Sequence, residues 1–104
     1  MIKLTILYGQ PSDPAAFEDY YTRTHMPLAA TMKGFEKMEY TKFINPSDGS
    51  KAAHYRMAEF WFKDALALQT TMNSPEGQAA GADLANFATG GVSLLVGTIE
   101  NLQH

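Results

Sequence analysis

The sequence predicts a single α+β domain, residues 1–104, in which a four-stranded antiparallel sheet carries helices on one face. Three observations support this prediction. Four segments alternate between apolar and polar residues and are rich in β-branched and aromatic side chains, as half-buried strands are. Between them lie stretches with helical spacing or composition, set off by clusters of Gly, Pro, Asn, Asp and Ser. The chain also has the length of one domain.

The first strand and the first helix are the clearest elements. Residues 2–8, IKLTILY, alternate as a strand does. After a turn, Asp13 stands immediately before Pro14, which is the order of an N-cap residue and a proline in the first helical position. One face of the helix that follows has the spacing expected of core residues, at Phe17, Tyr21, Thr24 and Leu28.

Pro27 interrupts this helix. Its ring removes a backbone hydrogen bond to the carbonyl of Arg23 and disfavours the α conformation at Met26. We therefore expect a break or kink around His25–Met26, after which the helix resumes and ends near Gly34.

The rest of the chain repeats the pattern. Residues 35–44 and 54–62 are predicted strands, separated by a polar loop. Helices are predicted at 64–72 and, after the Ser74-Pro75 start signal, at about 75–88, with a last strand at 92–99. The resulting order, β-α-β-β-α-β, is the ferredoxin-like arrangement.

The strands have apolar residues on both faces, whereas the helices can cover only one. In the third strand, Phe60 points to one side and Trp61 to the other, and the last strand alternates Leu94 with Leu95. Because the chain is too short to cover the second face itself, we expect a homodimer whose two sheets pack face to face, a dimeric α/β barrel. The alternative is a monomer that keeps a ligand groove or apolar surface there.

Composition excludes several classes of function. The net charge is -3, and only Arg23 and Arg56 are arginines, so a nucleic-acid partner is not expected. The absence of cysteine excludes disulfides, thiolate nucleophiles and cysteine-bound metals. The sequence shows neither a signal peptide nor an apolar stretch long enough to span a membrane, so we expect a cytoplasmic protein without membrane contact.

His25 is the best candidate for chemistry. It lies at the predicted kink, and Tyr21 lies four residues earlier on the same helical face. A histidine that titrates near neutral pH beside a tyrosine hydroxyl can act as a general acid or base. The alternative is structural, with the imidazole capping carbonyls that the kink sets free.

Other candidates are weaker. Glu59 is either a catalytic base in a pocket or a buried carboxylate paired with Arg56 or with a lysine of a second subunit. The histidines, with His54 and His104 as the other two, show no metal-binding spacing, so no metal and no cofactor are expected. The candidate substrate-binding side chains are Tyr8, Phe17, Tyr40, Glu59, Trp61 and Phe87.

The front half of the chain resembles the EthD family, named for its association with the degradation of ethyl tert-butyl ether. The resemblance rests on an early tyrosine and a turn with proline and aspartate, followed by spaced phenylalanine, tyrosine, histidine, proline and leucine. These are Tyr8, Pro11, Asp13, Phe17, Tyr20, Tyr21, His25, Pro27 and Leu28. The stretch from 85 to 92 is also similar, and the resemblance covers essentially the whole chain.

The resemblance implies a dimeric α/β barrel, with His25 as the position that carries over if the motif is catalytic and Tyr21 beside it. Related barrels include isomerases, lyases and oxygenases that need no cofactor. One hypothesis is therefore an enzyme that transfers a proton on a small hydrophobic or aromatic substrate. A second is an accessory protein that binds a hydrophobic metabolite for an oxidative degradation system. A third, with less support, is a haem-handling barrel with His25 or His54 as ligand.

Overall fold

The structure, a computed structural model, describes residues 1–100. The strands are β1 (Ile2–Tyr8), β2 (Lys37–Lys42), β3 (Arg56–Phe62) and β4 (Val92–Thr98). The helices are α1 (Pro14–Tyr20), the π-helix η1 (Tyr21–His25), α2 (Met26–Ala29), α3 (Ala65–Asn73), α4 (Pro75–Asp83) and the 3₁₀ turn η2 (Leu84–Asn86).

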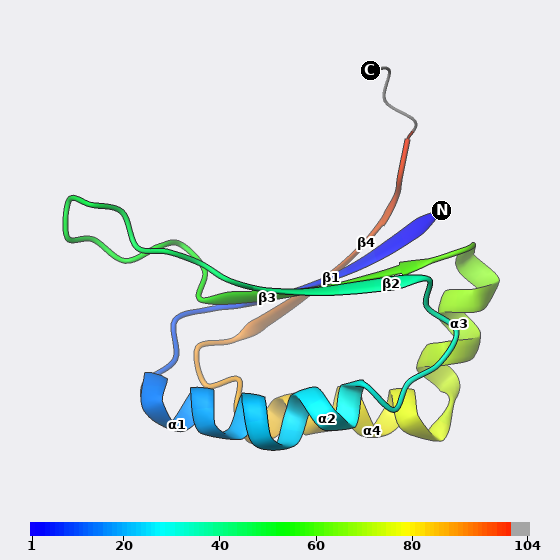
Figure 1. Cartoon of the computed structure of the whole chain (residues 1–104), viewed down its shortest axis with the longest axis horizontal. Coiled ribbons are helices and arrows are strands. Elements are labelled where there is room, and N and C mark those ends of the chain that lie inside the picture. The colour runs from blue at the N-terminus through cyan, green and yellow to red at the C-terminus, as the bar shows by residue number, and fades with distance from the viewer. Residues whose placement is uncertain (101–104) are drawn as a thin grey trace.

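The four strands form one sheet in the order β2-β3-β1-β4, and every neighbouring pair is antiparallel. All the helices lie on the same side of this sheet (Figure 1). The predicted ferredoxin-like α+β fold is confirmed. β1 has the predicted bounds, whereas β2, β3 and β4 are shorter than predicted by four, two and one residues.

The core lies between the sheet and the helices. On β1 the inward side chains are Leu4, Ile6 and Tyr8, and each is buried. Register places Ala58 and Phe60 of β3 beside Ile6 and Leu4, so that these side chains form one continuous apolar layer. The helices and the segments directly after them add Phe17, Tyr21, Ala29, Met32, Ala80, Leu84 and Phe87 to this layer.

The prediction that the helix breaks around His25–Met26 and that Met26 leaves the α conformation was wrong. Met26 keeps helical backbone angles, with φ −61° and ψ −45°, and its N–H donates to the carbonyl of Tyr21 five residues earlier. The helix runs from α1 through η1 into α2 (Figure 1). One wider π turn thus stands immediately before the proline, and such turns are often found at functional sites.

The outer face of the sheet is bare of helices (Figure 1). It is less apolar than the sequence predicted, since Thr5, Glu39 and Glu59 lie near its middle. Lys3 pairs with Glu59 at 3.0 Å on this face. β4 is exposed along nearly its whole length, with Leu94, Leu95 and Val96 each more than half exposed. Within residues 1–100, no helix has the length and hydrophobicity needed to cross a membrane.

Candidate functional site

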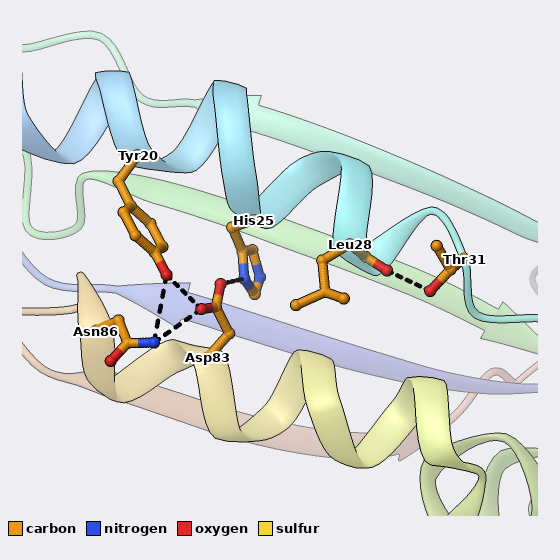
Figure 2. A network of polar contacts seen from close by, with 6 residues as sticks. All are labelled: Tyr20, His25, Leu28, Thr31, Asp83 and Asn86. Carbon is orange, nitrogen blue, oxygen red and sulfur yellow. Dashed lines mark hydrogen bonds and ion pairs between the residues drawn. The ribbon is translucent and has the colours of Figure 1, made fainter.

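The centre of the site is a buried pair formed by His25 and Asp83. The Nδ1 atom of His25 lies 2.9 Å from Oδ2 of Asp83 (Figure 2). The two side chains are only 5% and 8% exposed. Since an ionised carboxylate can only accept hydrogen bonds, Nδ1 carries the proton and donates it. In the neutral imidazole, Nε2 therefore keeps its lone pair.

Asp83 accepts two further hydrogen bonds on its other oxygen, Oδ1. The Tyr20 hydroxyl donates to it at 2.5 Å, and Nδ2 of Asn86 donates at 2.9 Å. Figure 2 shows the three donors pointing toward this carboxylate. Tyr20 and His25 belong to the continuous helix formed by α1, η1 and α2, and Asn86 belongs to η2. Burial raises the pKa of Asp83, but the hydrogen bonds from Tyr20, Asn86 and His25 outweigh it, and the pKa lies below its ordinary value. Asp83 is therefore ionised at neutral pH.

The position of Asp83 is costly without these donors. It is the last residue of α4, where the helix dipole disfavours negative charge. Burial adds to that cost. Three donors from two separate elements offset both effects, and this arrangement fixes the orientation of the imidazole.

His25 also lines a narrow cavity between the sheet and the helices. The cavity contains about 400 Å³ of atom-free space, part of it open to solvent, and most of this space is too narrow for a water molecule. Its walls are almost entirely apolar, from Leu4, Ile6, Ala58, Phe60, Met32 and Met72 among others. Tyr40 is the other polar side chain in the lining. Because Nδ1 is held by Asp83, Nε2 is the imidazole nitrogen available to a ligand.

Tyr21, predicted as the partner of His25, is a packing neighbour instead. Its ring stacks on the imidazole, with 5.7 Å between ring centroids and 21° between planes. Its hydroxyl and that of Tyr8 are buried, and neither forms a hydrogen bond of ordinary geometry within the described part of the chain. Burial raises the pKa of both tyrosines, so both stay protonated at neutral pH.

The predicted substrate-binding residues divide between the two faces of the sheet. Tyr40 lines the cavity, while Tyr8, Phe17 and Phe87 form an aromatic cluster with Tyr21 beside it. The ring of Phe87 lies 4.6 Å from that of His25, so Phe87 contacts the site directly.

Glu59 and Trp61 lie apart from this group. They project from β3 on the bare outer face, opposite Thr5 and Lys3, and they do not share the cavity with His25. Glu59 pairs with Lys3 of its own chain rather than with Arg56.

Arg56 instead forms a two-pronged ion pair with Glu18 of α1, with N–O distances of 2.9 and 2.7 Å. Hydrogen bonding to Arg56 lowers the pKa of Glu18 to about 2. The guanidinium also lies over the ring of Tyr21, 4.9 Å from its centroid. Arg56 thereby ties α1 to the sheet close to the aromatic cluster.

A metal centre finds no support among residues 1–100, where no three His, Cys, Asp or Glu side chains gather in a way that would hold an ion. His54 is exposed in the loop before β3. His104 lies outside the described residues.

Sequence reasoning missed Asp83, Asn86 and the role of Tyr20. Asp83 is 58 positions from His25, and no local spacing joins them. The sequence held no clear signal for Asp83, because the predicted helix ran to about residue 88 and did not place this aspartate at its carboxyl end.

The fold and the buried His–Asp pair define a ferredoxin-like α+β protein with a candidate acid–base site on the helical side of its sheet. The model of the EthD domain matches residues 9–91, and the chain belongs to that family. It is 38% identical over 95 residues to an uncharacterised 11.0 kDa protein of Rhodococcus erythropolis, encoded between thcB and thcC, with 91% of each chain covered. An EthD family protein of Bacillus halodurans is 36% identical, with a TM-score of 0.86 and coverage of 96% of this chain and 99% of that one.

More distant solved structures share the fold alone. SnoaB, a cofactor-independent oxygenase of Streptomyces nogalater, has a TM-score of 0.68 and 16% identity, with 97% of this chain and 94% of that chain covered. A dimeric ferredoxin-like protein of unknown function from Bacteroides fragilis has the same TM-score and identity, with 94% and 95% covered.

Proposed function

We propose that the protein binds a small hydrophobic or aromatic molecule in the helix-side cavity and that His25 transfers a proton on it without a cofactor. The observation that supports this most directly is the pairing of His25 Nδ1 with Asp83, which leaves Nε2 for the apolar cavity. A lone pair beside a water-poor cavity suits a general base.

In the proposed step, Nε2 accepts a proton from an O–H or an activated C–H of the ligand. The electron pair of that bond stays on the ligand as a phenolate or enolate, and the imidazole becomes an imidazolium. The Asp83 carboxylate, 2.9 Å from Nδ1, stabilises the new positive charge. Returning the proton to another ligand atom completes an isomerisation. In the oxygenase variant, the enolate carbon forms a bond to dioxygen, which is reduced to a peroxide anion, and this anion takes the proton back from the imidazolium. SnoaB, which shares the fold, is a cofactor-independent oxygenase.

The polar groups of the cavity restrict the ligand class. Among the lining residues only His25 and Tyr40 carry polar side-chain atoms, and no lysine or arginine is present to bind an anion. We therefore expect a neutral ligand with one weakly acidic group, such as a phenol or an enolisable aromatic ketone.

The test has two stages. A thermal-shift panel of phenols, quinones, polyketide-like acids, muconolactones, haem and short ethers identifies the class that binds. A ligand at 100 times its dissociation constant should stabilise the fold by about 2.7 kcal/mol. NMR then follows exchange of the ligand's acidic C–H in D₂O, and an oxygen electrode follows dioxygen uptake.

The enzyme proposal predicts that His25→Ala lowers turnover by about 10²- to 10⁴-fold while the protein stays folded. Turnover that survives in His25→Ala contradicts the role given to His25. Binding without any turnover by the wild-type protein favours the second candidate, an accessory protein that holds a hydrophobic metabolite, a function that the nearly all-apolar lining also fits.

We also propose a homodimer formed through the outer sheet faces. The support is the bare outer face, the exposed Leu95 of β4 on that face and the dimeric state of the Bacteroides fragilis protein with this fold.

A further inference from the structure

Small or apolar residues lie on the buried side of α4 and η2. Gly77 and Ala80 of α4 and Leu84 of η2 are buried, and Gly81 completes the helical spacing of this stripe. Gly81 differs from the others because it is exposed although it lines the cavity. A Cβ atom built at position 81 would meet nothing within 4 Å, apart from its own helix. The helix therefore leaves an open gap at this point.

The opposite side of the gap is β4. Leu94 lines the cavity and is nevertheless 51% exposed. Val96, two residues along on the same side of the strand, is 60% exposed. The cavity that contains buried His25 thus reaches the surface between Gly81 and Leu94, and an apolar strip on β4 continues outward from that opening.

The interior is adaptable although it is narrow. Met32 and Met72 both line it, and methionine side chains change rotamer at small cost. Entry of a ligand into so narrow a space requires such movement, and these two residues can supply it. Glycine in the middle of an exposed helix is otherwise unfavourable. An open passage gives a physical reason for its presence at position 81.

We propose that ligands enter between Gly81 and Leu94, and that the ligand is amphiphilic, with a weakly acidic head at His25 Nε2 and an apolar tail that lies in this opening against Leu94 and Val96. The proposal rests on the proposed function, because it takes His25 as the polar end of the site. It adds an entry route and an elongated shape for the ligand, and it makes the missing side chain at position 81 a determinant of ligand length.

The test uses 4-alkylphenols of increasing chain length as probes, with dissociation constants measured by calorimetry. In the wild-type protein, each methylene that leaves water should tighten binding about fourfold, equivalent to ~0.8 kcal/mol. Gly81→Leu places a side chain in the opening. It should leave phenol binding within about twofold and weaken binding of the hexyl and octyl compounds at least tenfold.

Two matched variants control for effects on the helix. Gly81→Ala adds a single methyl group and should weaken binding of the longest compounds less than Gly81→Leu does. Ala82→Leu adds the same side chain as Gly81→Leu at the next position of α4, which is exposed and does not line the cavity. Leu94→Phe narrows the opening from the strand side and should reproduce the loss if Gly81→Leu fails to fold.

The outcomes separate the two proposals. If short and long phenols bind Gly81→Leu and Leu94→Phe as tightly as the wild type, the entry route is overturned while the site at His25 stands. If Ala82→Leu weakens the long phenols as much as Gly81→Leu, the route is also overturned. If no phenol binds the wild-type protein, or if phenol binds without perturbing the His25 ring in NMR spectra, the proposed function fails and the route falls with it.

Discussion

His25 Nδ1 and Asp83 Oδ2 lie 2.9 Å apart although the residues are 58 positions apart in the chain. His25 stands at the end of the π turn that precedes Pro27, and Asp83 ends α4. The contact therefore joins two helical segments that lie side by side over the sheet, and it orients the imidazole at the same time. The following predictions depend on this contact or on the packing around it.

Asp83→Asn should lower the turnover rate, which depends on the orientation of the imidazole, and leave substrate binding nearly unchanged. A carboxamide has one acceptor oxygen, whereas Asp83 receives donors from His25, Tyr20 and Asn86 on two. We expect kcat for the substrate class found by the panel to fall by about 10²-fold or more, with KM nearly unchanged. Steady-state kinetics measure this, and Asp19→Asn, at an exposed site on α1, is the control. A large change in KM with kcat intact would show that Asp83 serves binding instead.

Tyr20→Phe should change the pH dependence of stability. Removal of the Tyr20 donor raises the pKa of Asp83 toward its ordinary value. A carboxyl whose pKa is lowered by folding stabilises the protein above its unfolded pKa, and that stabilisation is lost as pH falls through the folded pKa. The acid unfolding midpoint should therefore move to higher pH in Tyr20→Phe. Circular dichroism during acid titration tests this, and an unchanged midpoint would contradict it.

Glu18→Gln should destabilise the protein at neutral pH by about 1 kcal/mol, a value reduced for solvent screening of this partly exposed pair. Arg56 lowers the pKa of Glu18 from 4.5 to about 2. The wild-type advantage is present above pH 4.5 and should fade between there and about pH 2. Urea unfolding at several pH values measures it. Asp19→Asn removes an exposed ion pair to Arg23 and should cost almost nothing.

Two glycines of α4 should respond to alanine in opposite directions. At Gly77 a Cβ would clash with the carbonyl oxygen of Thr71, so Gly77→Ala should cost about 1–3 kcal/mol. At Gly81 the space is open, and Gly81→Ala should stabilise the protein by about 0.4–1 kcal/mol. Urea unfolding of both variants decides this, and equal effects would contradict the close packing of α4 on α3 at Gly77.

Leu95→Lys should weaken the proposed dimer. Leu95 is 52% exposed on the outer face of β4, where a charge would be buried against a second sheet. Light scattering coupled to size exclusion should give twice the chain mass of 11.5 kDa for the wild type and a shift toward the single mass in the variant. Leu66→Lys, at a residue of α3 on the helical side, should leave the mass unchanged. A wild-type protein that elutes at the single mass contradicts the dimer.

The sheet was predictable because its signal is local. Alternation within 2–8 and 54–62 placed the strands, and it correctly put Phe60 and Trp61 on opposite faces. Alternation does not say which face the helices cover. For that reason Glu59 and Trp61 were predicted to line the same site as Tyr8 and Phe87, although they lie on the opposite face of the sheet.

The site was only half predictable. His25 stood out because of its place before Pro27, but the adjustment of the backbone was not foreseen, since a π turn absorbs the missing hydrogen bond without leaving the helix. Asp83 comes to His25 only when α4 packs beside α2, a contact that no sequence spacing encodes. The sequence pointed to Tyr21, four residues before His25, as its hydrogen-bond partner, but in the structure the partner is Asp83.

The most direct test of the central claim is a long-range ¹H–¹⁵N correlation spectrum of the histidine rings at a pH where the imidazoles are neutral. The account predicts that His25 carries its proton on Nδ1, that exposed His54 shows the averaged shifts of a freely exchanging ring, and that Asp83→Asn shifts the His25 populations. A wild-type spectrum with the His25 proton on Nε2, or with tautomers mixed as in His54, would contradict it.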